Sequence, residues 1–250
     1  MRSGIIYDKL HGMKEKAAEY LLRDRLKNAD ALEQLKDPRT KVLYAGDDGV
    51  FFQYDFLFQL SAEPGTKKRF LPLLLSALPE RGEYLIVLHT PELSDDLQLL
   101  RNLEPIMDCC NCVYDASDPI PFTLPRDVEI RPLDQSHFPF VRAHYHSVDD
   151  ANYVRERIGA GMLGAFVNGE IAGFIGTHGE LSIGLLEVLP AFRRRGLAFA
   201  LEASMVNSLL AAGRLPFCQV RLGNDASFAL QKKLGFTVSD RPVRWMEHTK

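Results

Sequence analysis

The stretch that decides the fold is Val188-Leu-Pro-Ala-Phe-Arg-Arg-Arg-Gly-Leu-Ala198. It leaves a predicted strand, passes a proline, collects three arginines and enters a helix whose first turn holds Gly196 and Ala198. The first N–H groups of a helix have no intrahelical partner and carry a partial positive charge. Small residues there let a phosphate approach the backbone, so the stretch predicts a pyrophosphate site. A solvated basic turn is the competing interpretation.

The elements around this stretch alternate between strands and helices. Upstream, strands are predicted from 128, over 162–167 and 171–177, and over 181–189, with helices at 135–145 and 150–158. The dipeptide Asn168-Gly169 is a strong hairpin signal between two of these strands. Downstream, the helix after Gly196 is amphipathic, and its apolar and small residues keep i, i+3, i+4 spacing. A strand at 217–222, a helix from Asn224 to Gly235 and one or two strands over 238–246 complete the predicted unit.

The segment 118–125 divides the chain, because three prolines in eight residues block both a helix and a central strand. We therefore predict an N-terminal α/β accessory domain over 1–117, a linker over 118–127 and a second domain over 128–250. In the first domain the sequence predicts helices over the first 36 residues, over 67–78 and from an N-cap at Ser94, a hairpin over 41–54, and strands at 84–89 and from Cys112.

Composition excludes several classes of protein. The 250 residues carry 30 Lys and Arg against 33 Asp and Glu, a net charge of −3, so a dedicated nucleic-acid binder is not expected. No apolar run reaches the roughly 18 residues that span a bilayer, and no signal-peptide core opens the chain, so no membrane partner and a cytoplasmic location are expected. Three of the four cysteines crowd 109–112, which is no disulfide framework.

Two motifs are set aside. The glycines of Gly159-Ala-Gly-Met-Leu-Gly164 follow a helix and open a strand, whereas a dinucleotide fingerprint needs the reverse order. Asp108-Cys-Cys-Asn-Cys112 lacks the second Cys or His pair that a structural zinc site requires. We therefore expect no metal, and we interpret these cysteines as reduced thiols on a strand.

Two motifs resemble those of the GCN5-related N-acetyltransferases (GNAT). Arg193-x-x-Gly196-x-Ala198 matches the (Gln/Arg)-x-x-Gly-x-(Gly/Ala) signature, and the second family motif is similar to residues 224–236. The resemblance covers 128–250 and implies a mixed-sheet α/β fold with a smaller, degenerate GNAT-like N-terminal unit. A narrower likeness, to the glycine N-acyltransferase-like branch, lies in Ser94-Asp-Asp-Leu, in 153–158 and in Trp245.

The resemblance implies acyl transfer from an acyl-CoA, with acetyl-CoA as the expected donor, to the amine of a small molecule or an amino acid. Backbone amides of the arginine stretch would hold the pyrophosphate, and neighbouring positions would contact the pantetheine arm. A homodimer stays open. The cofactor-binding residues implied in this way are Leu186, Val188, Arg193, Arg194, Arg195, Gly196, Leu197, Ala198, Asn224 and Ser227.

The reaction needs a base for the acceptor ammonium. Several relatives have a glutamate where this chain has Ser182, so the candidates are Glu180, Glu187 and His178. Simple alternation places Glu180, Ser182, Gly184 and Leu186 on one face of the strand and Glu187 on the other, unless a bulge, common in this strand of the family, switches the parity.

The acid position departs from the family pattern. Many relatives have a tyrosine at the position of Gln231, and an amide cannot donate a proton in its place. Ser227, one turn earlier, could hydrogen-bond the thiolate instead. Ser182 and Gln231 favour an alternative, a non-catalytic acyl-CoA-binding or sensor module. A protein-directed N-acetyltransferase is the third hypothesis, and it predicts an open groove beside Glu180.

Overall fold

The computed structural model describes residues 2–249, with side chains from Gly12 onward. The chain divides into two compact units. The first comprises 2–111, 220–225 and 238–249, and the second comprises 112–219 and 226–237. The expected linker at 118–127 therefore lies inside the second unit, and the last strand of the chain belongs to the first.

Strand pairing explains why the last strand belongs to the first unit. The strand β12 (Val243–His248) lies antiparallel to β4 (Tyr84–Leu88) on one side and to β5 (Glu104–Val113) on the other. The Arg244 guanidinium also pairs with the Asp108 carboxylate of β5 at 2.8 Å. These contacts join residues about half the chain apart, so the pattern of prolines could not predict them.

The first unit has the sheet order β1-β2-β3-β4-β12-β5. Helices over the first 36 residues and the hairpin are confirmed, whereas β3 had no predicted counterpart. Ser94 was predicted to be the N-cap of the helix α4, but Leu93 takes that position. The Ser94 Oγ instead accepts a hydrogen bond from Arg244. The further elements are α1 (Arg2–Leu21), α2 (Ala29–Lys36), β1 (Lys41–Gly46), β2 (Gly49–Tyr54), β3 (Leu57–Ala62), α3 (Lys67–Ala77) and α4 (Ser94–Arg101).

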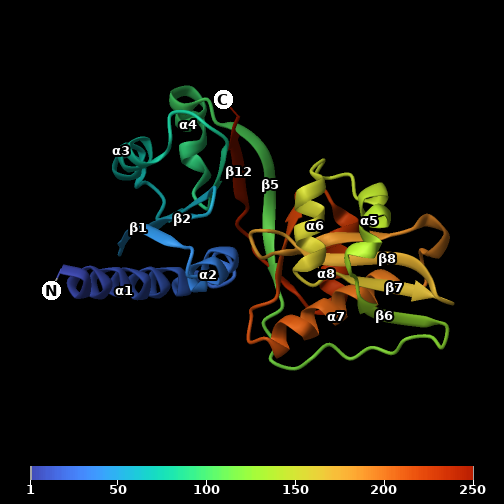
Figure 1. Ribbon diagram of the computed structural model, residues 1–250. Helices are drawn as coiled ribbons and strands as arrows, with labels where there is room; N and C mark the ends of the chain where they lie inside the picture. Colours follow the sequence, from blue (N-terminus) through green and yellow to red (C-terminus); the bar gives the residue numbers. More distant parts are fainter. Residues whose placement is uncertain (1, 250) are drawn as a thin grey trace. The chain divides into compact units, whose positions relative to one another are not determined.

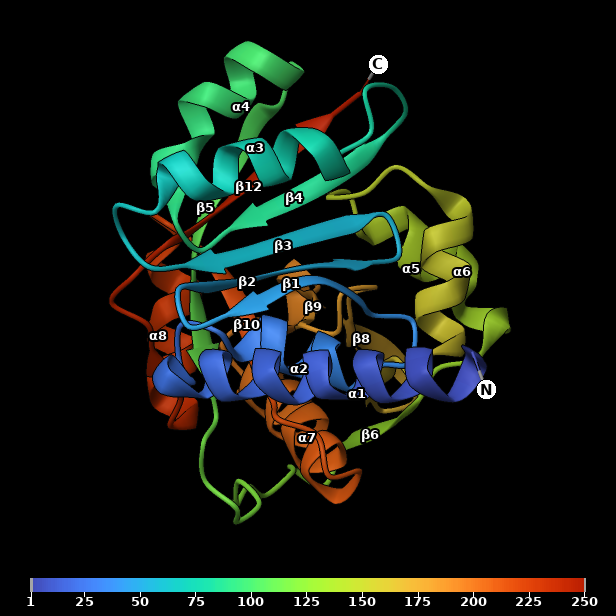
Figure 2. The ribbon, with the colours of Figure 1, turned by 90° about the vertical axis from the view of Figure 1, so that its left-hand side faces the viewer.

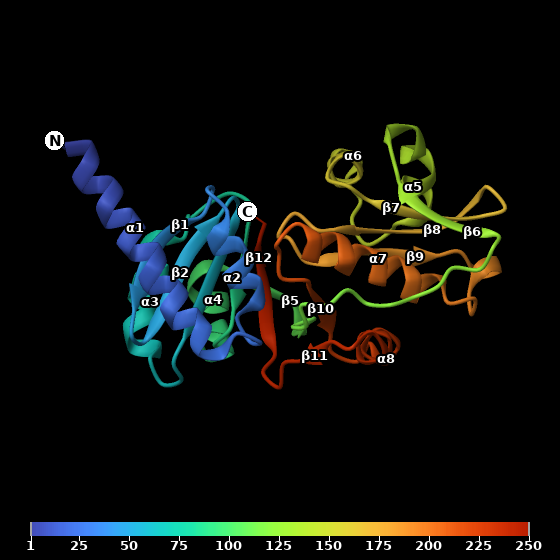
Figure 3. The same cartoon turned by 90° about the horizontal axis from the view of Figure 1, so that it is seen from below.

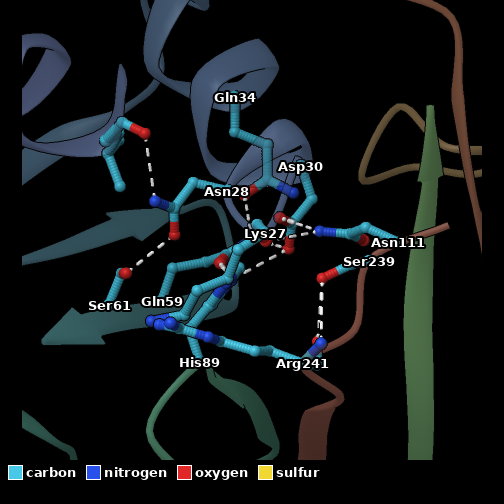
Figure 4. A network of polar contacts seen from close by, with 11 residues as sticks. Lys27, Asn28, Asp30, Gln34, Gln59, Ser61, His89, Asn111, Ser239 and Arg241 are labelled. Atoms are coloured by element: carbon cyan, nitrogen blue, oxygen red, sulfur yellow. Dashed lines mark hydrogen bonds and ion pairs between the residues drawn. The ribbon is translucent and has the colours of Figure 1, made fainter. Parts of the chain in front are cut away.

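The two faces of β3 differ in polarity. Phe58 and Leu60 pack into an apolar core with α3 and α4, while Gln59 and Ser61 alternate onto the face covered by α2 (Figure 2). There the Asp30 carboxylate contacts the His89 ring at 3.2 Å, within a buried polar network (Figure 4). On β3 the sheet thus has an apolar face towards α3 and α4 and a polar patch towards α2.

The second unit has the sheet order β10-β9-β8-β7-β6. In Figure 1 the helices α5 and α6 lie on one face of this sheet and α7 on the other, as the two separate apolar clusters require. The predicted elements are confirmed within a few residues of their expected ends. They are β6 (Val128–Pro132), α5 (Phe138–His144), α6 (Ala151–Gly159), β7 (Leu163–Val167), β8 (Glu170–Thr177), β9 (Ile183–Val188), α7 (Leu197–Ala211), β10 (Phe217–Arg221), α8 (Asp225–Leu234) and β11 (Thr237–Val238).

Both units follow one order of elements. Two helices precede three antiparallel strands, then come a helix, a strand parallel to the third, and another helix. This repeat confirms the expected mixed α/β fold with a related N-terminal unit. Within residues 2–249 no helix is long and apolar enough to cross a membrane.

Candidate functional site

The parallel pair β9–β10 separates almost at once. Its register contains one residue pair, Ile183 with Cys218. The corresponding pair in the first unit, β3–β4, runs over four residue pairs. From Gly184 onward the edge of β9 that faces β10 is therefore not used in the sheet. An extended molecule with amide groups can pair with such an edge as an added strand.

A bulge in β9 decides which side chains share a face. Leu185 has φ +50°, and the register with β8 shifts there by one residue. Glu187 lies opposite Phe174, and Gly184 lies opposite Gly176, so Glu187 and Gly184 point to the face covered by α5 and α6. Simple alternation predicted that Leu186 and Gly184 share one face of the strand and that Glu187 lies on the other. This prediction is wrong, because the bulge puts Glu187 on the same face as Gly184.

The loop before α7 has the backbone geometry of an anion site. After a short turn at Pro190–Phe192, Arg194 and Gly196 take left-handed conformations with φ of 62° and 81°. The first intrahelical hydrogen bond runs from the Ala200 N–H to the Gly196 carbonyl. The N–H groups of residues 197–199 come before this first hydrogen bond, so the helix itself offers them no carbonyl acceptor. A Cβ at Gly196 would meet nothing within 4 Å, so the space beside the loop is open.

Two of the three arginines are engaged within the protein. Arg193 donates to the Val188 carbonyl at 2.9 Å and to the Glu187 carboxylate at 3.2 Å. Arg195 donates to the Asp127 carboxylate at 2.6 Å, and this hydrogen bond lowers the Asp127 pKa. Within the part of the chain that the structure describes, Arg194 alone of the three has no ion pair. The positive charge expected here is therefore partly neutralised before any ligand binds.

A hollow of about 260 Å³ opens beside this loop. The segment interpreted as a linker forms one wall of it, the first turns of α7 form another, and Lys233 of α8 closes a side above the Phe199 ring. The hollow combines an apolar lining with cationic rims, which suits a nucleotide. It is lined by Phe122, Thr123, Leu124, Pro125, Arg195, Gly196, Leu197, Phe199, Ala200 and Lys233.

A polar cluster lies at the start of β9, on the α5–α6 side. The His178 ring lies against Gly184, where an added Cβ would be 2.2 Å from Nε2, and Nδ1 is 2.7 Å from the Tyr153 hydroxyl. The Ser182 hydroxyl donates to the Glu180 carboxylate at 2.8 Å. Burial and then the charge of Glu180 raise the pKa of Tyr153, so that phenol stays protonated. The structure thus brings His178 and Glu180 to one place, with Glu187 further along the same face.

The structure also reveals a buried carboxyl that was not among the predicted site residues. Glu202 of α7 is buried, and its Oε1 accepts a hydrogen bond of 2.8 Å from the amide of Gln231 on α8. Burial raises the pKa of Glu202 to about 7, and the Gln231 hydrogen bond acts in the opposite direction. The sequence did hold a local signal for this buried carboxyl, because Glu202 is the only ionisable residue in α7, whose other residues are apolar or small and uncharged.

The remaining predicted residues lie on or before α8. Ser227 is half-buried one turn before Gln231, and it faces the same side of the helix. Asn224 is exposed in the turn before α8, and its N–H donates to the Arg221 carbonyl. The four cysteines are buried and are not joined in disulfides, and no group of metal ligands is found among the described residues.

Comparisons with known proteins agree with this geometry. The FR47-like protein family model matches residues 162–246. A Drosophila protein of solved structure is 17% identical, with 96% of this chain and 95% of that chain covered and a TM-score of 0.71. A GCN5-related N-acetyltransferase from Kribbella flavida is 13% identical over 94% and 96%, with a TM-score of 0.58. The chain has the GNAT fold.

A third similar structure has a tandem arrangement of two GNAT units. This tandem GNAT protein from the clavulanic acid biosynthesis pathway is 16% identical, over 96% of this chain and 94% of that one, with a TM-score of 0.54. It agrees with the repeated order of elements in the GNAT fold of this chain. No curated protein matches in sequence. The narrower likeness to the glycine N-acyltransferase-like branch therefore stays a prediction.

Proposed function

We propose that the second unit is an acyl-CoA-dependent N-acyltransferase, with acetyl-CoA as donor and a small-molecule amine or amino acid as acceptor. The observation that carries this proposal is the separation of β9 from β10 after the single pair Ile183–Cys218, next to the left-handed loop before α7. A pantetheine arm has amide groups that can pair with the open edge of β9, and the loop offers N–H groups to the pyrophosphate.

Each end of the donor has a matching surface. Of the N–H groups of Arg193 to Ala198, the Arg193 N–H donates to the Pro190 carbonyl, so those of Arg194 to Ala198 would hold the pyrophosphate, with Arg194 as the available side-chain cation. The hollow beside the loop would receive the nucleotide. Leu186 and Val188 would contact the pantetheine arm from β9, and Asn224 and Ser227 would hydrogen-bond it. Binding thus relies on backbone groups and a gap in the sheet more than on charged side chains.

His178 is the base that the geometry favours. Its ring lies over Gly184, where the strands start to separate, and Nδ1 is fixed by Tyr153. With the proton on Nδ1 donated to the Tyr153 oxygen, Nε2 has a lone pair for the acceptor ammonium. Glu180, in the same cluster, and Glu187, held by Arg193, are the alternative bases.

The step itself is direct attack in a ternary complex. The deprotonated amine nitrogen bonds to the thioester carbonyl carbon, and collapse of the tetrahedral intermediate breaks the carbon–sulfur bond. The products are the amide and coenzyme A. The aromatic residues of α5 and α6, among them Tyr153 and Phe140, cover this face of the sheet, which supports a small acceptor over a protein chain.

Release of coenzyme A from acetyl-CoA in the presence of a panel of amines and amino acids tests the proposal. Turnover with one of them is the expected result. Tight binding of acetyl-CoA without turnover on any acceptor would support the sensor module instead. Turnover only on peptides would support the protein-directed enzyme.

A further inference from the structure

The contact between Glu202 and Gln231 has two unsatisfied oxygens. Both side chains are 2% exposed, and one hydrogen bond of 2.8 Å joins Gln231 Nε2 to Glu202 Oε1. Among the residues that the structure describes, neither Oε2 of Glu202 nor Oε1 of Gln231 has a hydrogen-bond partner. A buried polar atom without a partner costs about 1–3 kcal/mol. A pair serving only to join two helices would be expected to satisfy these atoms or to be replaced by apolar residues.

The pair lies where the donor thioester would enter. Helix α7 packs on β7, β8 and β9, and α8 directly follows β10 (Figure 3). A contact from α7 to α8 therefore bridges the line along which β9 and β10 separate. Ser227, one turn before Gln231, faces the same side of α8. The two unsatisfied oxygens thus border the expected path of the pantetheine arm.

The chemistry of Glu202 suits a proton donor. Burial raises its pKa to about 7, so a large share of the carboxyl is protonated at neutral pH. Burial is the larger cause, and the hydrogen bond from Gln231 opposes it. An acid is most effective when its pKa is near the working pH. The position of Gln231 is also the one where a tyrosine was expected and is missing.

We propose that Glu202 protonates the departing thiolate of coenzyme A and that Gln231 positions its carboxyl. This inference rests on the function proposed above. As the carbon–sulfur bond breaks, its electron pair goes to sulfur, and the proton of the Glu202 carboxyl forms the S–H bond. Glu202 is left as a carboxylate and regains a proton from water, while the proton lost by the amine leaves through the base. Glu202 is then a catalytic residue and Gln231 a positioning residue.

The first test is the pH–rate profile of Glu202→Gln. This substitution keeps the shape of the side chain, and its amide oxygen can still accept the hydrogen bond from Gln231. We expect kcat to fall about 10- to 100-fold with an unchanged dissociation constant for acetyl-CoA, and the alkaline limb near pH 7 to disappear. Gln231→Leu should move that limb to higher pH, because the hydrogen bond that lowers the Glu202 pKa is lost, and it should have no further effect in the Glu202→Gln background. Glu170→Gln, at the exposed first residue of β8, is the matched control. Wild-type turnover with an unchanged Glu202→Gln profile would overturn the inference and leave the proposed function standing.

A second test does not depend on turnover. The thiol of bound coenzyme A can be titrated through the ultraviolet absorbance of its thiolate. Above neutral pH the Glu202 carboxylate should repel the thiolate, so Glu202→Gln should lower the pKa of the bound thiol by on the order of one unit. An identical thiol pKa in both proteins would place Glu202 away from sulfur and refute the inference. Failure of coenzyme A to bind at all would refute both the inference and the proposed function.

Discussion

His178 and Tyr153 are joined by a contact of 2.7 Å between Nδ1 and the phenol oxygen, although they lie 25 positions apart in the chain. Tyr153 belongs to α6 and His178 follows β8, so the contact ties a helix to the turn that leads into the separated strand β9. Packing of the ring against Gly184 fixes its second side. A histidine held on two sides is oriented as a general base needs to be.

His178→Gln should lower kcat by about 100-fold or more, because a positioned base contributes about 10²- to 10⁴-fold. Binding of acetyl-CoA should not change, since the His178 ring lies on the face covered by α5 and α6, where we propose that the acceptor binds. The pH dependence of kcat/KM would be measured for this variant and for Glu180→Gln and Glu187→Gln. If His178→Gln keeps the wild-type profile and one of the glutamate variants loses its acidic limb, that glutamate is the base.

Gly196→Glu should abolish acetyl-CoA binding, because it puts bulk and negative charge at the proposed phosphate position. The matched control is Gly213→Glu, at the opposite end of α7. Gly213 has a similar positive φ of 68° and equally open space, so it imposes the same backbone strain without meeting the ligand. Calorimetric titration measures both variants. Equal affinities in the two would place the phosphates elsewhere.

The first unit should bind no acetyl-CoA, so one chain should bind one molecule. There β3 and β4 stay paired, and the Thr90 hydroxyl donates to the Ala62 carbonyl at 2.7 Å while accepting from the Ala62 N–H. The first unit therefore has no separation between β3 and β4 like the one between β9 and β10. Calorimetry should give a stoichiometry near one, and Gly196→Glu should remove all of it. A second equivalent that survives Gly196→Glu would contradict the prediction.

Asp30 should make the first unit sensitive to acid. Burial by itself would raise the pKa of Asp30, but the charge of His89 and hydrogen bonds from His89 and Asn111 outweigh it and lower the pKa below its usual value. A depressed pKa contributes stability above the unfolded pKa, near 4, and this stability is lost as the pH falls through the folded value. Asp30→Asn should lower the free energy of unfolding by about 3 kcal/mol at neutral pH and flatten its decline on acidification.

Urea unfolding of Asp30→Asn, wild type and the control Asp240→Asn would be followed from about pH 7 to about pH 3. Asp240 is an exposed carboxylate of the same unit, so its variant should follow the wild type. An Asp30→Asn protein as stable as the wild type at neutral pH would show that the His89 contact does not stabilise the unit.

Glu202 should act on stability in the opposite direction. Its folded pKa of about 7 exceeds the unfolded value of 4.5, so its contribution is complete below the unfolded pKa and is lost as the pH rises through the folded one. The wild type should therefore lose about 3 kcal/mol of unfolding free energy between these pH values relative to Glu202→Gln. Unfolding curves at several pH values measure this, with Glu170→Gln as a control that follows the wild type. Parallel curves for all three proteins would mean that Glu202 ionises normally.

Sequence alone determined the features that depend on neighbours in the chain. The arginine stretch predicted a turn into a helix, and Arg194 and Gly196 have positive φ in that turn, while its role as a phosphate site stays a prediction. Asn168-Gly169 predicted its hairpin, and both residues have positive φ. Helix and strand periodicity predicted the order of elements and hence the fold class. These signals are local because backbone conformation and amphipathic spacing are set within a few residues.

Only the tertiary structure decided which distant groups meet. Residues 238–249 belong to the first unit, and the proline-rich segment lies inside the second. The bulge at Leu185 determined the face of Glu187, because one extra residue reverses the alternation. Glu202 and Gln231 meet across 29 positions, and although Glu202 is the only ionisable residue of α7, no local pattern identifies Gln231 as its partner. Strand register, burial and the pKa values that follow from burial depend on contacts between remote segments, and no local pattern encodes them.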